Sequence, residues 1–291
     1  MKPTNPTNNP PGTASNLDLV QSSKSTAMSR MIIAVHAPVK HGKTFLAATA
    51  SQFFPASLPS PTDVELDDLL WLTFDVGALD GFTEVGLSVP QIDVTSILAS
   101  TRGDIFKATD LAMQAAQAYI QRGLTSWIVV DTVSSLDRML NEYWERNNPA
   151  SGTGEEKFVL YRMIASSHAK FYTNLTLIAP RIIFLFHSTA KFDTDDKARR
   201  KTRATAMPGE SAIVPEITGK SRGTYLANCS LELALRAVKD PSSKTIKRTV
   251  YPYGGMDFEG GGRFHQSLGQ EEPANLTHIL AKIKTGRPKS G

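Results

Sequence analysis

MIIAVHAPVKHGKT, residues 31–44, is the stretch of sequence that decides the fold. Its first five residues, Met31 to Val35, are apolar and partly β-branched, which predicts a strand buried on both faces of a sheet. A polar loop follows, and the residues from Thr44 to Phe54 predict a helix that ends before Pro55. A strand, a glycine-containing loop and a helix in this order create a site for phosphate groups.

The loop 37–44 matches the Walker A spacing, with Ala37 where the usual pattern has its first glycine. An alanine fits there, although a required positive φ would be costly for it. Gly42 lets the backbone approach a phosphate, Lys43 is expected to reach the β- and γ-phosphates of ATP, and the hydroxyl of Thr44 is expected to bind Mg²⁺. The alternative is a coincidental turn. The residues expected to bind the nucleotide are Ala37, Pro38, Val39, Lys40, His41, Gly42, Lys43 and Thr44.

A second apolar strand, Trp127 to Val130, ends in Asp131 and has the pattern of a Walker B strand. We expect this strand to lie next to the strand that precedes the loop, where Asp131 holds the magnesium ion through water. A helix N-cap is the alternative role for such an aspartate. Together, the two motifs predict a site for ATP and Mg²⁺ in which Thr44 and Asp131 hold the metal ion.

The remaining pattern alternates apolar strands with helices, which predicts an α/β fold with a mostly parallel central sheet flanked by helices. Two C-terminal segments, 230–238 and 245–253, alternate like strands around the turn sequence 240–243 and predict an antiparallel hairpin. The stretch 191–222 predicts no clear element. Further strands are expected at 69–74 and 181–186, and helices at 105–121, 134–144, 155–177 and 275–283.

Composition sets the organisation and excludes several classes of protein. The chain has 291 residues, a formal net charge of +4 and one cysteine, Cys229, so an intramolecular disulfide and a cysteine-based zinc site are excluded. No apolar run reaches membrane-spanning length, and the Pro- and Asn-rich start does not resemble a secretory signal. We expect a soluble cytoplasmic protein without a membrane partner. The predicted units are a disordered arm (1–29), one domain (30–270), and a C-terminal helix with a basic tail (271–291).

Three segments resemble those of the RecA-like P-loop ATPases, and specifically the phage AAA/RecA-like proteins of the Sak single-strand-annealing group. They are the loop with Pro38 and Lys40, the run LTFDVGALD at 72–80, and the run VDTVSSL at 130–136. The resemblance covers roughly residues 31–253. It implies a RecA-like ATPase that acts in DNA recombination or single-strand annealing.

Four residues are expected to be catalytic, namely Lys43 and Asp131 of the Walker motifs together with Asp75 and His187. His187 follows the strand 181–186 and falls where the family has a polar sensor of the γ-phosphate. The family's catalytic glutamate is missing, because the matching region reads Asp75-Val76-Gly77. Asp75, Asp80 or Glu84 are then the candidates to polarise the attacking water, and turnover is expected to be slow or to need a neighbouring subunit. The alternatives are a turn cap for Asp75 and a hydrogen-bonded core residue for His187.

In the resembling family, the segment after the fourth strand binds DNA. Here that segment is basic, which favours sequence-independent binding of single-stranded DNA, although a solvated loop is the alternative. The resemblance also implies a ring or filament of identical subunits, with an arginine from Arg199, Arg200, Arg203 or Arg222 acting on a neighbour's nucleotide. A single-stranded DNA-binding protein is a further expected partner. The predicted DNA-binding residues are Lys197, Arg199, Arg200, Lys201, Arg203, Lys220 and Arg222.

Two other function classes stay open on the sequence alone. A small-molecule kinase would need an arginine-rich lid and an acceptor pocket after the Walker B strand, and the Ser-Ser-Leu run at 134–136 and the C-terminal hairpin fit that class poorly. A nucleotide-switched loader or assembly ATPase, which binds a protein partner rather than DNA, is the stronger alternative because of the missing glutamate.

Overall fold

The computed structural model describes residues 30–58, 63–123, 125–148, 154–192, 211–218, 220–240, 245–252, 261–262, 264 and 267–285. Three sets of predictions lie outside the described residues: those on the arm 1–29, those on the basic cluster 197–203, and those on the tail after Thr285. None of the helices in the described part of the chain is long and apolar enough to cross a membrane.

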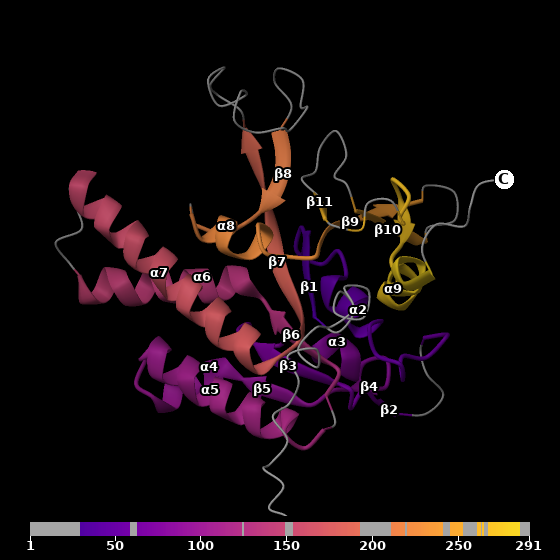
Figure 1. Ribbon diagram of the computed structural model, residues 1–291, viewed down its shortest axis with the longest axis horizontal. Coiled ribbons are helices and arrows are strands. Elements are labelled where there is room, and N and C mark those ends of the chain that lie inside the picture. The colour runs from indigo at the N-terminus through magenta and orange to yellow at the C-terminus, as the bar shows by residue number, and fades with distance from the viewer. Residues whose placement is uncertain are drawn as a thin grey trace, which may run out of the picture.

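A large sheet forms the centre of the molecule, with the strand order β12-β10-β9-β1-β7-β6-β3-β5 (Figure 1). The pairs from β9 through β5 are parallel, whereas β10 and β12 are added antiparallel at one edge. The strands on this path are β1 (Met31–Ala37), β3 (Leu69–Thr73), β5 (Gln91–Asp93), β6 (Trp127–Asp131), β7 (Arg181–Phe192), β9 (Leu231–Lys239), β10 (Ile246–Tyr251) and β12 (Glu272–Pro273).

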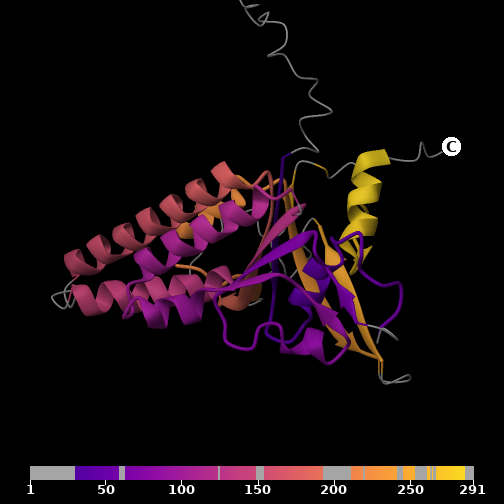
Figure 2. The same cartoon turned by 90° about the horizontal axis from the view of Figure 1, so that it is seen from below.

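Helices cover both faces of this sheet, as Figure 2 shows from the side. Side chains alternate along a strand, so Ala34 of β1 packs on one face while Ile33 and Val35 pack on the other. The first face carries α4 (Val94–Ser100), α5 (Ile105–Ile120), α6 (Val133–Asn147), α7 (Gly154–Ile178) and α8 (Ser221–Leu226). The second carries α2 (Lys43–Ala48), α3 (Asp80–Thr83) and α9 (Leu276–Thr285).

Four short strands lie off this path. β2 (Val64–Glu65) and β4 (Leu87–Ser88) form a small parallel pair, and β11 (Gly261–Gly262) pairs with β9. β8 (Ser211–Pro215) pairs antiparallel with the far half of β7. The prediction of an α/β fold with a mostly parallel sheet, flanking helices and a C-terminal antiparallel hairpin is confirmed; β9 and β10 form the hairpin.

The helix predicted from Thr44 to Phe54 is shorter than expected, since α2 ends at Ala48. Polar side chains divert the backbone there. The hydroxyl of Thr49 donates to the carbonyl of Leu46 at 2.6 Å, and the carboxylate of Asp68 accepts a bond from the amide of Gln52 at 3.0 Å. Such side-chain bonds compete with the helical pattern and end the helix early.

Three further expectations about the elements are wrong. β7 continues through His187 to Phe192, and the stretch 191–222, for which no element is predicted, contains β8 and α8. The Walker B strand β6 is also not next to β1, because β7 pairs with both and lies between them. His187 therefore lies within a strand, opposite Ala37, instead of following a strand end.

Candidate nucleotide-binding site

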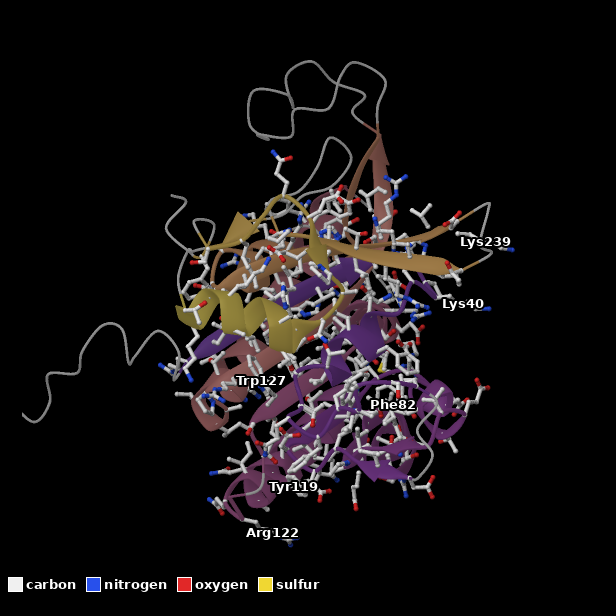
Figure 3. All side chains as sticks on the ribbon, turned by 90° about the vertical axis from the view of Figure 1, so that its right-hand side faces the viewer. Lys40, Phe82, Tyr119, Arg122, Trp127 and Lys239 are labelled. Carbon is white, nitrogen blue, oxygen red and sulfur yellow. The ribbon has the colours of Figure 1, made fainter. Side chains whose placement is uncertain are left out.

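The loop between β1 and α2 has the shape of a phosphate cradle. Gly42 precedes α2 with φ 95°, and Lys40 also adopts a positive φ, of 66°. Ala37 is the buried last residue of β1 in extended conformation, so the positive φ that made alanine a concern lies at Lys40 and Gly42 instead. Figure 3 shows Lys40 pointing away from the body of the molecule, on the same side as Lys239.

Lys43 lies at the base of the loop and is largely buried. Its Nζ donates to the carbonyls of Ala37 at 3.2 Å and Pro38 at 3.3 Å, and contacts Nδ1 of His187 at 3.3 Å. Burial lowers the pKa of Lys43, while the carboxylates of Asp131 and Asp75 oppose that effect. The ammonium group is therefore held where the end of β1 lies beside the middle of β7.

Thr44 and Asp131 meet although 87 positions separate them in the sequence. The Thr44 hydroxyl donates to Oδ2 of Asp131 at 3.0 Å, and Nε1 of Trp71 donates to the same oxygen at 3.3 Å. Asp131 is buried at the end of β6, and burial raises its pKa despite these two bonds and nearby Lys43. The peptide bond that follows it is cis.

These oxygens fit a magnesium ion. Mg²⁺ prefers hard oxygen ligands and is usually held by one or two protein groups together with water and phosphate oxygens. Among the described residues, no cluster of three or more His, Cys, Asp or Glu side chains forms a complete metal cage. Thr44 and Asp131 are the residues that would hold the ion, which when bound neutralises charge on the β- and γ-phosphates.

His187 connects the lysine to a second carboxylate. Its backbone amide donates to the hydroxyl of Ser134 at 2.9 Å, which fixes it beside the start of α6. While Nδ1 faces Lys43, Nε2 lies 3.8 Å from Oδ2 of Asp75. Since a lysine can only donate, Nδ1 accepts, so we assign the proton to Nε2, on the side of Asp75.

Asp75 follows β3 and is held by side chains from α6 and its N-cap. Thr132 donates to it at 3.1 Å, Ser135 also donates, and a guanidinium nitrogen of Arg138 lies 3.6 Å away. Burial alone would raise the pKa of Asp75, but the bonds from His187, Ser135 and Thr132 outweigh burial and hold the pKa below its ordinary value. Asp75 is thus an ionised carboxylate at neutral pH.

A cavity of about 670 Å³ opens over these groups, a volume within the range of small-molecule sites. Its walls bring Lys43, Thr44, Asp75, Asp131 and His187 together. The wall also includes Glu84, a residue weighed for water activation, whereas Asp80 lies beside it at the start of α3, near Gly77.

The sequence did not single out three residues around this cavity. Arg248 of β10 lines it, Trp71 binds Asp131, and Ser134 positions His187. Trp71 carried a signal, since a polar indole in a buried strand needs a partner. The sequence around Arg248 carried no such signal, because only the order of strands in the folded sheet brings β10 close to the loop.

The predicted DNA-binding residues do not form one described surface. Lys220 is exposed at the start of α8. Arg222 is partly buried, and its charge faces the buried carboxyl of Glu232 on β9. The cations Lys197, Arg199, Arg200, Lys201 and Arg203 lie outside the described residues.

Comparison with known proteins bears on this geometry. A family model described as an AAA domain matches residues 29–264, which is most of the chain and includes every residue of the cavity. The chain belongs to this AAA domain family. Membership implies a P-loop ATPase that binds nucleotide, typically with Mg²⁺.

Other comparisons add little to the AAA domain assignment. Among curated proteins, none matches the chain. A solved structure, a KaiC-like protein from the hyperthermophilic archaeon Pyrococcus horikoshii OT3, aligns over 77% of this chain and 78% of its own, with 11% identity and a TM-score of 0.35. This similarity is too low to support an argument about the fold. The fold of the AAA domain is therefore defined by the strand order and register of this chain.

Proposed function

We propose that this AAA domain binds and hydrolyses ATP, and that bound ATP controls its contact with single-stranded DNA during recombination or single-strand annealing. The observation that carries the ATPase part is the convergence of Lys43, His187 and Asp75 in one cavity with the Thr44–Asp131 pair. Cations, a hydroxyl and carboxylates are the groups that phosphoryl transfer requires.

Each group has a task in this proposal. Lys43 leaves the loop carbonyls and binds the β- and γ-phosphates, and its contact to His187 reports whether the γ-phosphate is present. Asp75 is ionised and can accept a hydrogen bond from the attacking water, which makes it our first candidate for orienting that water. Glu84 at the cavity wall is the second candidate.

The test of ATP binding is the substitution Lys43→Ala. We expect ATP affinity to fall by roughly tenfold or more, the value of a hydrogen bond to a charged group, and turnover to be lost. Calorimetric titration with ATP and Mg²⁺, together with phosphate release, measures both. Lys107→Ala, which removes an exposed lysine of α5, serves as the control and should change neither. Equal affinity and turnover in the Lys43 variant would contradict the site.

The DNA part of the proposal is supported by the ribbon of β7 and β8. β7 carries His187 in the cavity and continues to Phe192, and β8 returns antiparallel from Ser211. The sequence between them, 193–210, contains the five clustered cations. β8 is fixed at its other end, because the amide of Glu216 donates to the carbonyl of His187 at 2.7 Å, and Ser134 donates to the carbonyl of Glu216. A change at the γ-phosphate can therefore be passed from His187 along β7 to the sequence 193–210, which directly follows this strand.

Neutralising three of these cations tests DNA binding. With Arg199, Arg200 and Lys201 all changed to Gln, we expect weaker binding to single-stranded DNA and a salt slope smaller by roughly two, because about 0.7 counterions are released per phosphate contact. The control changes three exposed cations of α5 and α7 to Gln, namely Lys107, Arg162 and Lys170. Fluorescence anisotropy at several salt concentrations gives both slopes. An unaltered slope in the first variant would place DNA binding elsewhere.

The alternative is a loader or assembly ATPase that binds a protein partner. The same protein samples distinguish it from the proposed DNA-dependent function. ATP turnover is measured with and without single-stranded DNA at low and moderate salt. Stimulation by DNA supports the proposal, and turnover with no DNA affinity favours the alternative. The proposal includes a ring or filament of identical subunits, which light scattering with and without ATP tests, and a single-stranded DNA-binding protein as a partner.

A further inference from the structure

Arg248 reaches the phosphate loop from a distant part of the chain. It lies on β10, in the strand that pairs with β9, and its Nε donates to the carbonyl of His41 at 3.2 Å. A Cβ atom placed on Gly42 would be 2.7 Å from Nε and 3.2 Å from Cδ of Arg248. The arginine therefore packs directly against the one glycine that lets the loop approach a phosphate, and it lines the same cavity as Lys43.

The imidazole of His41 fixes the loop to the neighbouring strand. The amide of Ala237 on β9 donates to Nδ1 of His41 at 3.2 Å. Burial lowers the pKa of His41, and the charges of Lys43, Arg248 and Arg236 lower it further. His41 is thus neutral at neutral pH, and two cations, the buried Lys43 and the exposed Arg248, donate to carbonyls of the loop.

The charge of Arg248 is uncompensated within the described part of the chain. There, its side chain bonds through Nε to His41, and no carboxylate is paired with it. The two terminal nitrogens of the guanidinium are consequently available to a ligand. A guanidinium presents donors in a planar fork that matches the oxygens of a phosphate group.

We propose that Arg248 is a second phosphate-binding cation of the nucleotide site, supplied by the same chain through the β9–β10 hairpin. It binds phosphate oxygens of a nucleoside triphosphate on the outer side of the loop, while Lys43 binds from within. This inference rests on the proposed nucleotide binding. It differs from an arginine donated by a neighbouring subunit, because Arg248 already contacts the loop of its own chain.

Arg248 could instead only hold the loop through its bond to His41, so the experiment must separate charge from hydrogen bonding. Three variants of the full chain do so: Arg248→Ala removes both, Arg248→Gln keeps a donor without charge, and Arg248→Lys keeps the charge. Lys247→Ala is the matched control, since it removes the adjacent exposed cation of the same strand. Calorimetry with ATP and with ADP, each with Mg²⁺, is performed at low and at moderate salt.

We expect Arg248→Ala and Arg248→Gln to weaken ATP binding by about tenfold or more and to reduce its salt dependence, as loss of a charge-assisted contact predicts. Arg248→Lys should recover part of the affinity, and Lys247→Ala should bind like the unchanged protein. Wild-type affinity in the Gln variant would show that the contact is only structural and overturn the proposal. Wild-type affinity in all three Arg248 variants would overturn it as well. If Lys43→Ala still lost ATP affinity in that case, the proposed nucleotide binding would stand without a role for Arg248. Absence of ATP binding by the unchanged protein would overturn both.

Discussion

Gly42 is the residue whose backbone the phosphate loop depends on most directly. Its φ of 95° is a conformation that residues with a side chain rarely adopt, and Arg248 fills the space that a Cβ would need. The loop is therefore limited twice at this position, by the backbone angle and by the neighbouring side chain. Gly77 of the same cavity wall has both limits as well, with a φ of 72° and Asp80 2.6 Å from an added Cβ, but Gly42 is the one that directly precedes Lys43.

The substitution Gly42→Ala is expected to weaken ATP binding by roughly tenfold or more, because the loop must change shape or displace Arg248. Gly123→Ala is the control. It also has a positive φ, of 76°, but nothing lies within 4 Å of its added Cβ. We expect the control to lose about 1 kcal/mol of stability and to keep its affinity for ATP. Titration calorimetry and urea unfolding measure the two quantities; equal affinities in both variants would sink this account of the loop.

At the residue scale, the sequence predicted local motifs, but it did not predict contacts between residues that are distant along the chain. The segment 37–44 and Asp131 could be found because short spacings fix their chemistry. The roles of Trp71 and Arg248 depend on which strands become neighbours, and a sequence without its fold does not say that β10 lies beside β9 at the loop. Arg222 is a similar case, since the sequence did not indicate that its charge faces Glu232, and its contact with DNA stays a prediction.

Among the elements, β1 and β9 create an unusual polar contact inside the sheet. Ala34 is the register partner of Glu232, and Nε2 of His36 lies 3.9 Å from Oε1 of Glu232. Burial raises the pKa of Glu232 to about 7, against the opposing charge of Arg222 on α8. Burial, with Arg222 and Lys43, lowers the pKa of His36 to about 3. Both groups are thus held mainly in their neutral forms at mildly acidic pH.

The substitution Glu232→Gln should change how stability depends on pH. In the unfolded chain, Glu232 loses its proton near the ordinary glutamate pKa of 4.5, whereas the folded protein keeps it until about pH 7. The folded state binds more protons in this window, so stability falls as pH rises from about 4.5 to 7 and then levels off. The variant should lack this decrease, which amounts to on the order of 3 kcal/mol at most.

Urea unfolding at pH 5, 6, 7 and 8 measures the effect as a difference between the variant and the unchanged protein. His36 contributes an opposite slope, because its folded pKa is depressed and stability is lost as pH falls below about 6.5, but that slope is common to both proteins. Glu65→Gln, at an exposed position of β2, is the control. A constant difference across the four pH values would mean that Glu232 is not held protonated.

Strands proved easier to predict than short helices and returning strands. β1, β3 and β6 are buried on both faces, so nearly every side chain in them is apolar. β8 and α8 contain only five and six residues, and their partners are distant, so no local period identifies them. The placement of β7 between β1 and β6 is likewise a property of the assembled sheet.

On the scale of the whole molecule, α9 joins the C-terminal part of the chain to the phosphate-binding side of the sheet. Leu276, Ile279 and Ile283 are buried in the same core as Leu46 of α2. The amide of Leu276 also donates to the hydroxyl of Thr49 at 2.7 Å, directly after α2. The predicted boundary between residues 270 and 271 separates α9 from the domain that contains this core, and it stays a prediction.

The substitution Ile279→Ala tests how far α9 belongs to the domain. Ile279 is fully buried, so we expect the loss of about 2–5 kcal/mol of stability, with a single unfolding transition as in the unchanged protein. Leu177→Ala removes the same kind of surface at an exposed position of α7 and should stay within about 0.5 kcal/mol. Denaturant unfolding followed by circular dichroism compares them. An unchanged midpoint for Ile279→Ala would show that the helix is a detachable appendage.

The central position of β1 has a consequence for biosynthesis. β1 leaves the ribosome long before its two partners, which begin at Arg181 and Leu231. At roughly 5–20 residues per second, the phosphate loop waits on the order of ten seconds or more for the strands that hold it in place. Until Leu231 emerges, the nascent β1 lacks at least one of its two partners, so a pause or premature stop before that point would release an aggregation-prone chain in need of a chaperone.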